Sequence, residues 1–169
     1  MLPFILLPLL LALLLFWLAN RQQKQTGLPG GRIVYSDTRG WARVEKPLYD
    51  ARLGLTGKPD YLIDQSDLLI PVEVKTGRTP SAPYDSHIFQ VAAYCLLVQR
   101  TYGKRPTHGL IKYPHRTFQI DYTPQLEREL LTLLDEMHLA RRKRTLPRSH
   151  DQAARCARCG FRKICDQQL

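Results

Sequence analysis

The stretch GKPDYLIDQSDLLIPVEVK, residues 57–75, decides the fold class of this chain. Within it, two mainly apolar runs, 60–64 and 68–75, flank a short polar turn, and this pattern is typical of a β-hairpin. Side chains alternate between the two faces of a strand, so Glu73 and Lys75 are expected on one face. The stretch therefore predicts a hairpin that carries a charged pair at the end of its second strand.

The same hairpin is expected to bring Asp60 alongside Glu73. Two carboxylates at one point repel each other unless a cation lies between them, and Mg²⁺ or Mn²⁺ prefers oxygen ligands. Such a metal polarises a phosphoryl oxygen and lowers the pKa of a bound water. Lys75 is placed to hold or help deprotonate that water and to stabilise developing negative charge. An exposed Glu-x-Lys pair is also a common solvated ladder of opposite charges, so this pattern alone does not decide between the two.

The hydrophobic pattern around the hairpin predicts an α/β protein with a mixed sheet. The expected elements are strands at 32–35, 41–49, 109–112 and 117–121, a turn-like approach at 55–59, and helices at 88–100 and from Pro124 onward. Thr123 is expected to cap the second helix, whose first position is proline. Its apolar stripe consists of Leu126, Leu130, Leu133, Leu134 and Met137. Strands, helix, strands, helix is the order of a central sheet flanked by helices.

The helix predicted at 88–100 carries a second polar pattern. Gln90 and Tyr94 are four residues apart and therefore share a helix face. An amide and a phenol that project together from an apolar helix indicate a lined site, although a helix edge that meets water gives the same pattern. Cys95 follows Tyr94 and is interpreted as an ordinary core cysteine.

Three of the four cysteines lie within the last fourteen residues, as Cys156-x2-Cys159-x5-Cys165. Small secreted proteins spread their cysteines along a disulfide framework, which is not the pattern here. A terminal cluster of three favours a metal or iron–sulfur site in a reducing compartment.

The N-terminal segment predicts a membrane anchor. Residues 2–19 carry no charged side chain, and eighteen helical residues span about 27 Å, enough to cross a hydrocarbon core. A signal peptide is the competing interpretation, but no basic residue precedes the run and no small-x-small cleavage site follows it. Arg21 and Lys24 lie directly after the run. The positive-inside rule then places the globular part in the cytoplasm, on a single-pass anchor in the cell membrane.

The formal net charge of +10 belongs to residues 21–169. A domain this basic usually contacts a polyanion. Much of the charge is C-terminal, in Arg141, Arg142, Lys143, Arg144, Arg148, Arg155, Arg158, Arg162 and Lys163. These side chains are expected to bind the phosphates of a DNA backbone. The alternatives are that they bind an anionic lipid leaflet or only keep the protein soluble. Four of the five histidines, His87, His108, His115 and His138, show no ligand spacing and are interpreted as surface or hydrogen-bonded side chains.

Taken together, these motifs resemble the RecB-like nucleases of the PD-(D/E)XK superfamily, and most closely the CRISPR-associated exonucleases of the fourth type. The family's GxxD motif matches Gly57 to Asp60, and its ExK motif matches Glu73 to Lys75. Its QxxxY helix motif matches Gln90 to Tyr94, and its cysteine trio matches the C-terminal one. Each motif is weak alone, but four in the right order are fairly specific.

The resemblance implies a restriction-endonuclease-like core that cuts DNA with Mg²⁺ or Mn²⁺. It implies that Asp60, Glu73 and the Val74 carbonyl hold the metal, that Lys75 is the catalytic lysine, and that Gln90 and Tyr94 support the site. It also implies a [4Fe–4S] cluster on Cys156, Cys159 and Cys165 with a fourth cysteine.

The chain departs from the family pattern upstream of the core. It has no cysteine before Cys95, so the fourth cluster ligand is missing, and zinc with His150 as fourth ligand is an alternative to the cluster. The family also often carries an acidic or histidine residue on an upstream helix, a place for which Glu45 is the candidate here.

These observations predict four regions: a transmembrane anchor (1–20), a linker (21–31), a PD-(D/E)XK nuclease core (32–145) and a basic, cysteine-containing C-terminal module (146–169). The expected function is a membrane-anchored, metal-dependent deoxyribonuclease whose partners are DNA and the membrane. The alternative is a non-catalytic DNA-binding or scaffold protein on the cytoplasmic membrane face. Intact Asp60, Glu73 and Lys75 favour the enzyme, because a binding protein has no need of all three.

Overall fold

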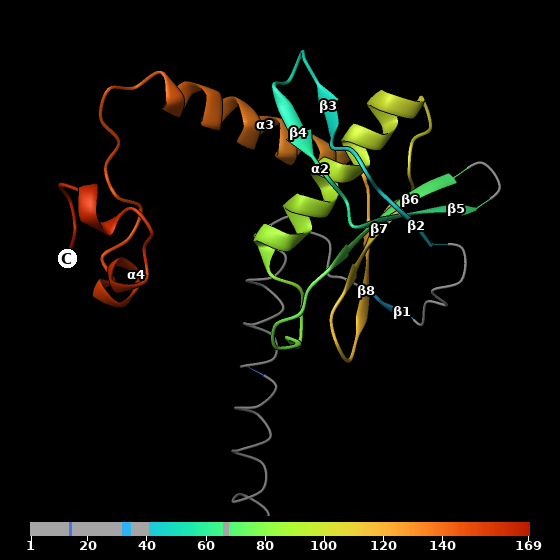
Figure 1. Cartoon of the computed structure of the whole chain (residues 1–169), viewed down its shortest axis with the longest axis horizontal. Helices are drawn as coiled ribbons and strands as arrows, with labels where there is room; N and C mark the ends of the chain where they lie inside the picture. Colours follow the sequence, from blue (N-terminus) through green and yellow to red (C-terminus); the bar gives the residue numbers. More distant parts are fainter. Residues whose placement is uncertain (1–13, 15–31, 35–40, 66–67) are drawn as a thin grey trace, which may run out of the picture. The chain divides into compact units, whose positions relative to one another are not determined.

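A six-stranded mixed sheet forms the centre of the fold in the computed structural model, which describes residues 14, 32–34, 41–65 and 68–169 (Figure 1). The strand order is β1-β8-β7-β6-β5-β2. The strands are β1 (Arg32–Val34), β2 (Trp41–Arg43), β5 (Tyr61–Gln65), β6 (Leu68–Val74), β7 (His108–Lys112) and β8 (Thr117–Asp121). The prediction of a mixed sheet flanked by helices is confirmed.

One parallel strand pair makes the sheet mixed. β6 and β7 run parallel, and the other neighbouring strands in the sheet run antiparallel. Parallel neighbours need a long crossover connection, and α2 (Asp85–Tyr102) supplies it. Figure 1 shows α2 lying against β6 and β7, the two strands that it connects. The helix therefore covers the carboxyl end of β6, where the charged pair predicted from the sequence is located.

The β5–β6 hairpin presents a different layer of the core on each face. Leu62 and Leu69 pack on the α2 side, against Leu97 and its neighbours. Ile63 and Ile70 belong to a separate buried cluster together with Val72 and Leu110. The alternation of side chains along β6 then places Glu73 on the same face as Leu69, toward α2.

A small second sheet lies on the other side of α2, and the sequence did not predict it correctly. β3 (Leu48–Asp50) pairs with β4 (Leu55–Gly57). The expected strand at 41–49 is therefore two strands, and the expected turn-like segment at 55–59 begins with a third. The Asp50 carboxylate closes the hairpin by accepting hydrogen bonds from the backbone N–H groups of Arg52, at 2.8 Å, and Leu53, at 3.1 Å. Three-residue strands are too short for a period-two pattern to identify.

The second long helix, α3 (Pro124–Arg141), begins as the sequence predicts. The Thr123 hydroxyl accepts the N–H of Leu126 at 3.1 Å, which is the expected N-cap bond. Leu126, Leu130 and Leu134 are buried, whereas Leu133 is only partly buried. Met137, assigned to the same apolar stripe, is 54% exposed. The buried part of the apolar stripe therefore ends at Leu134 and does not reach Met137.

The chain divides into two compact units, Met1–Thr132 and Leu133–Leu169, so α3 passes from one into the other. The second unit contains α4 (Ala153–Ala157) and η1 (Arg162–Ile164). Its buried apolar residues are Leu134 and Cys156. With so few apolar neighbours available there, an apolar side chain at the end of α3 has little to pack against, which explains the exposure of Met137.

The predicted anchor, residues 2–19, and the predicted linker lie outside the described residues, apart from Leu14. Within the described ranges, no helix combines the length and the apolar character needed to cross a membrane.

Candidate active site

Asp60 and Glu73 lie next to each other where the β5–β6 hairpin opens. The antiparallel register pairs Tyr61 with Val72, and continuing it by one residue sets Asp60 opposite Glu73. The Val74 N–H donates to Asp60 Oδ2 at 2.8 Å, which fixes this carboxylate against β6. Glu73 is only 8% exposed. The hairpin thus places two carboxylates side by side, as its sequence predicts.

Lys75, Gln90 and Tyr94 join Glu73 in one hydrogen-bonded network. Lys75 Nζ donates to Glu73 Oε1 at 2.9 Å and to Gln90 Oε1 at 2.7 Å. The Gln90 amide nitrogen donates to Glu73 Oε1 at 2.9 Å and to Tyr94 Oη at 2.8 Å. Because the lysine needs an acceptor and the carboxylate needs a donor, only one orientation of the Gln90 amide satisfies both. The strand and the helix therefore fix the lysine from two sides.

Tyr94 remains a neutral phenol at physiological pH. Burial, the largest cause, raises the pKa of Tyr94 to about 12, and the negative charge of Glu73 adds to this effect. A phenol that accepts the Gln90 N–H still has its own proton to donate. Tyr94 can therefore orient Gln90 and donate a hydrogen bond, but it does not act as a base.

The donor set at the hairpin fits a hard divalent cation. The bonds from Lys75 and Gln90 end on Glu73 Oε1, and the bond from Val74 ends on Asp60 Oδ2, so both carboxylates are held in place with their oxygens at the end of the hairpin. Mg²⁺ typically takes one or two carboxylates and fills its remaining positions with water and phosphate oxygens. Throughout the described part of the chain, no three His, Cys, Asp or Glu side chains converge as a metal site. A two-carboxylate site completed by the Val74 carbonyl is compatible with that finding.

His87 lies beside this network, and the sequence did not predict its position. Its Nδ1 atom is 2.6 Å from Tyr113 Oη, so the expectation of a hydrogen-bonded histidine holds. Burial, followed by the positive charge of Lys75, lowers the pKa of His87. The histidine lines a cavity that also reaches Lys75. Its spacing of three residues from Gln90 places both on one helix face, and that spacing is the signal that could have identified it.

Gly57, the glycine of the GxxD motif, lies under the ring of Tyr94. A Cβ atom at position 57 would come within 2.8 Å of Tyr94 Cε1 and 3.0 Å of Leu97 Cδ1. Such overlap requires the tyrosine ring or the β4 backbone to move. The glycine is therefore needed for the close approach of β4 to α2.

Gly57→Ala is expected to destabilise the fold by about 1–3 kcal/mol, the usual cost of overpacking. It should also lower any activity of the site, because a displaced Tyr94 cannot hold Gln90. Thermal unfolding and activity of the variant measure the two effects. Gly160→Ala is the control for unfolding, since a Cβ atom at Gly160 meets nothing within 4 Å. A Gly57→Ala protein that melts and acts like the wild type would contradict this account.

Glu45, the candidate for the family's upstream acidic residue, lies near the site along the chain. The preceding residue, Val44, donates its N–H to the Asp60 carbonyl at 3.3 Å. The Glu45 side chain is exposed.

The C-terminal cysteines are not gathered into a metal site. Cys156 is buried in α4, Cys159 is exposed, and Cys165 is partly buried after η1. They form no metal-binding group within the described ranges. His150, the alternative zinc ligand, accepts the Gln152 N–H on its Nδ1 atom at 3.2 Å. As they stand, these residues do not fit an iron–sulfur cluster or a zinc ion.

Cys95 is the core cysteine that the sequence predicts. It is 1% exposed within α2, and burial raises the pKa of its thiol. Its sulfur faces Gly109 on β7, where an added Cβ atom would lie 3.2 Å away. Cys95 therefore packs α2 against the sheet.

Comparison with known proteins identifies the family of this chain. The model of the PD-(D/E)XK nuclease superfamily matches residues 9–166. A CRISPR-associated exonuclease Cas4 from Aeropyrum pernix is 30% identical over 143 residues, which are 80% of this chain and 68% of that protein. Cas4 from Rhodospirillum rubrum is 30% identical over 122 residues, 70% of this chain and 37% of that protein. A Cas4/Cas1 fusion from the same organism is matched over only 21% of its length, so this chain spans a minor part of both Rhodospirillum relatives. The resemblance inferred from the motifs is confirmed, and the chain belongs to the PD-(D/E)XK nuclease superfamily, where it is similar to the Cas4 exonucleases.

Proposed function

We propose that this protein is a metal-dependent deoxyribonuclease that hydrolyses phosphodiester bonds. Its active site would consist of Asp60, Glu73 and Lys75. The observation that carries the proposal is the network in which Lys75 is held between Glu73 and Gln90 while the Asp60 carboxylate is fixed against the same strand. A solvated charge ladder needs no buried glutamate and no glutamine fixed from two sides. Those features favour a reaction centre over the simple surface pair that the Glu-x-Lys pattern also allows.

Asp60, Glu73 and the Val74 carbonyl would hold Mg²⁺ or Mn²⁺. When bound, the metal supplies Lewis-acid polarisation of the phosphate and a more acidic water. The carboxylates orient these ligands, since both are fixed by hydrogen bonds to the protein. The hairpin therefore provides oxygen ligands on a rigid element, and a metal site needs such an element to hold its ligands in a precise geometry.

Lys75 is proposed to stabilise charge on the attacked phosphate. An ammonium group has three N–H donors, and in this structure two of them reach Glu73 and Gln90. The third is left to donate to a phosphate oxygen or to hold the attacking water. This arrangement suits electrostatic stabilisation of the negative charge that develops on the phosphate.

DNA is the proposed substrate. The formal charge of +10 suits a phosphate backbone, and the Cas4 relatives are named as exonucleases. No step of this mechanism uses an iron–sulfur cluster, and among the described residues Cys156, Cys159 and Cys165 form no metal-binding group.

We also propose that residues 2–19 anchor the enzyme in the cell membrane, with the nuclease unit in the cytoplasm. The support is the uncharged run followed by Arg21 and Lys24. Sodium carbonate extraction of cell membranes tests this proposal. The full chain should stay in the pellet, and a chain that begins at residue 21 should be released; release of both would contradict it.

The nuclease proposal is tested with the full-length chain, purified in detergent, on end-labelled single- and double-stranded DNA. Cutting should require Mg²⁺ or Mn²⁺ and stop when the metal is chelated. The fragment pattern then distinguishes exonuclease from endonuclease action. If the protein cuts neither substrate with either metal but binds DNA with a steep salt dependence, the scaffold alternative replaces the enzyme.

A further inference from the structure

A cavity of about 380 Å³ opens directly beside Lys75, at the end of β6. Its walls come from β6, the loop that leads to α2, the first turn of α2, and the end of β7. The lining residues are Val74, Lys75, Thr76, Gly77, Arg78, Tyr84, His87 and Tyr113. The volume is within the range of small-molecule sites, about 300–1,000 Å³. A group bound here would therefore be adjacent to the phosphate that Lys75 contacts.

Part of the wall of this cavity is aromatic, with Tyr84, His87 and Tyr113 all among its lining residues. Tyr84 is 54% exposed. Its ring meets His87 edge-on, with ring centroids 5.3 Å apart, and His87 is in turn bonded to Tyr113. Exposed aromatic rings of fixed orientation bind unpaired nucleobases by stacking, without need for a particular sequence. The chemistry of this wall thus suits a base of a single DNA strand.

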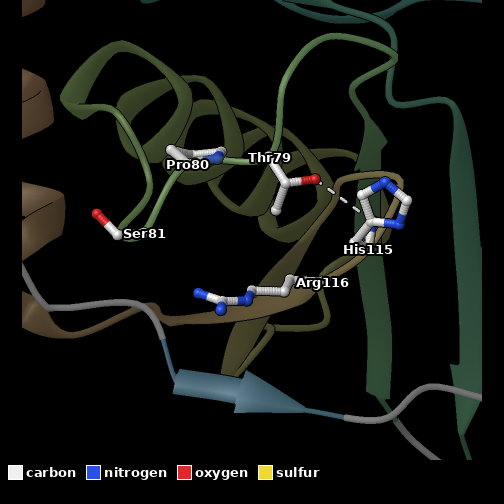
Figure 2. Close-up of a pocket in the computed structure, with 5 residues that line it drawn as sticks. All are labelled: Thr79, Pro80, Ser81, His115 and Arg116. Atoms are coloured by element: carbon white, nitrogen blue, oxygen red, sulfur yellow. Dashed lines mark hydrogen bonds between the residues drawn. The ribbon is translucent and has the colours of Figure 1, made fainter.

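A second pocket, of about 340 Å³, continues along the same loop (Figure 2). It is lined by Thr79, Pro80, Ser81, His115 and Arg116. Figure 2 shows the Thr79 hydroxyl directed toward His115, whose backbone N–H it accepts at 3.3 Å. Because Thr79 acts as the acceptor in that bond, its own proton can be donated to a ligand. Figure 2 also places Arg116 across this pocket from Pro80 and Ser81.

The two pockets carry positively charged side chains, as a surface that binds DNA phosphates does. Lys75 and Arg78 line the first pocket and Arg116 the second, and neither is lined by an acidic residue. Arg78 and Arg116 form no ion pair with any residue that the structure describes. Guanidinium and hydroxyl groups are the usual protein donors to DNA phosphates. The loop between β6 and α2 contributes to both pockets, with Thr76, Gly77, Arg78 and Tyr84 in the first and Thr79, Pro80 and Ser81 in the second.

We propose that the loop 76–84 and the turn 113–116 bind the nucleotide next to the attacked phosphate in a single DNA strand. The base stacks on Tyr84 in the first pocket, and the next phosphate binds Arg116 and Thr79 in the second. This assignment rests on the proposed nuclease function, because Lys75 defines which phosphate is attacked. It also predicts the path of the DNA strand, which would run from the reaction centre along the loop 76–84.

The test uses the full-length protein without divalent metal, so that binding is measured without cutting. Fluorescence anisotropy gives the Kd for labelled single-stranded oligonucleotides, each with one abasic residue at a successive position from an end. In the wild type, one abasic position should weaken binding more than its neighbours. Tyr84→Ala should raise the Kd for the intact strand by about tenfold, as expected for one lost stacking contact. In this variant, an abasic residue at the sensitive position should weaken binding no more than an abasic residue at a neighbouring position. Tyr84→Phe should retain both properties.

Matched substitutions separate this site from general surface effects. Tyr102 is a similarly exposed tyrosine at the other end of α2, and Tyr102→Ala should bind like the wild type. Arg116→Ala should lower the slope of log Kd against log salt by about one. Arg128→Ala, at an exposed position on α3, should leave the slope unchanged.

The outcomes distinguish this site from the nuclease proposal. If Tyr84→Ala binds every oligonucleotide as the wild type does, the nucleotide site is wrong even when the wild type cuts DNA. If the Tyr84 effect is present but no metal supports cutting in a parallel assay, the nuclease proposal fails and the strand-binding site stands.

Discussion

Replacing Lys75 by alanine is expected to lower the rate of DNA cutting by about a hundredfold to a thousandfold, the usual loss when one charge-stabilising donor is removed. The lysine contacts Glu73 at 2.9 Å and Gln90 at 2.7 Å, and its third N–H is directed to substrate in the proposed mechanism. Alanine supplies none of these donors. Single-turnover cutting of labelled DNA at saturating Mn²⁺ measures the loss directly.

Lys112→Ala is the matched control for this prediction. Lys112 is on the neighbouring strand and pairs in register with Val74, so its side chain faces away from Glu73 and Lys75. Its cutting rate should stay near that of the wild type. DNA affinity of Lys75→Ala should change little without metal, because many other basic residues contribute. A Lys75→Ala protein that is folded and cuts at half the wild-type rate or faster would refute the assigned role.

Glu73→Gln is expected to weaken Mn²⁺ binding by at least about a hundredfold, because it removes one of two charged ligands; second-shell changes alone cost about 10–100-fold. The substitution keeps the size of the side chain and an oxygen that can accept from Lys75. Its effect should therefore arise from lost charge and not from lost packing. Isothermal titration with Mn²⁺ measures the affinity, and cutting should fall in parallel.

Asp64→Asn provides the corresponding control on the same hairpin. Asp64 is exposed near the end of β5, and its neutralisation should leave Mn²⁺ affinity unchanged. Should Glu73→Gln bind Mn²⁺ as tightly as the wild type, the metal is held elsewhere and the site needs reassignment.

Most of the candidate site could be predicted from the sequence because it depends on local geometry. The alternation of side chains along β6 and the four-residue spacing on α2 are fixed by backbone periodicity. They place Glu73 beside Lys75 and Gln90 beside Tyr94, and the hairpin register adds Asp60. Thr123 before Pro124 predicted the start of α3 for the same reason, since a cap requires only neighbouring residues.

The features that the sequence did not predict depend on contacts between distant segments. The β3–β4 hairpin has strands of three residues and is stabilised by packing of Leu48 and Leu55 against α2. His87 shares a helix face with Gln90, but its contact with Tyr113, 26 residues away, joins segments that are distant in the sequence. The metal site expected from the cysteine trio stays a prediction, since Cys156, Cys159 and Cys165 form no metal-binding group among the residues that the structure describes. Spacing predicts shared faces within one element, but it does not predict how loops fold back.

The central claim, that Asp60 and Glu73 hold the catalytic metal, is tested most directly by a crystal structure of the protein soaked with Mn²⁺ and measured for anomalous scattering. The account predicts one anomalous peak within bonding distance of both carboxylates and of the Val74 carbonyl oxygen, and no such peak in Glu73→Gln. A Mn²⁺ ion located elsewhere in a protein that cuts DNA, with none between Asp60 and Glu73, would contradict it.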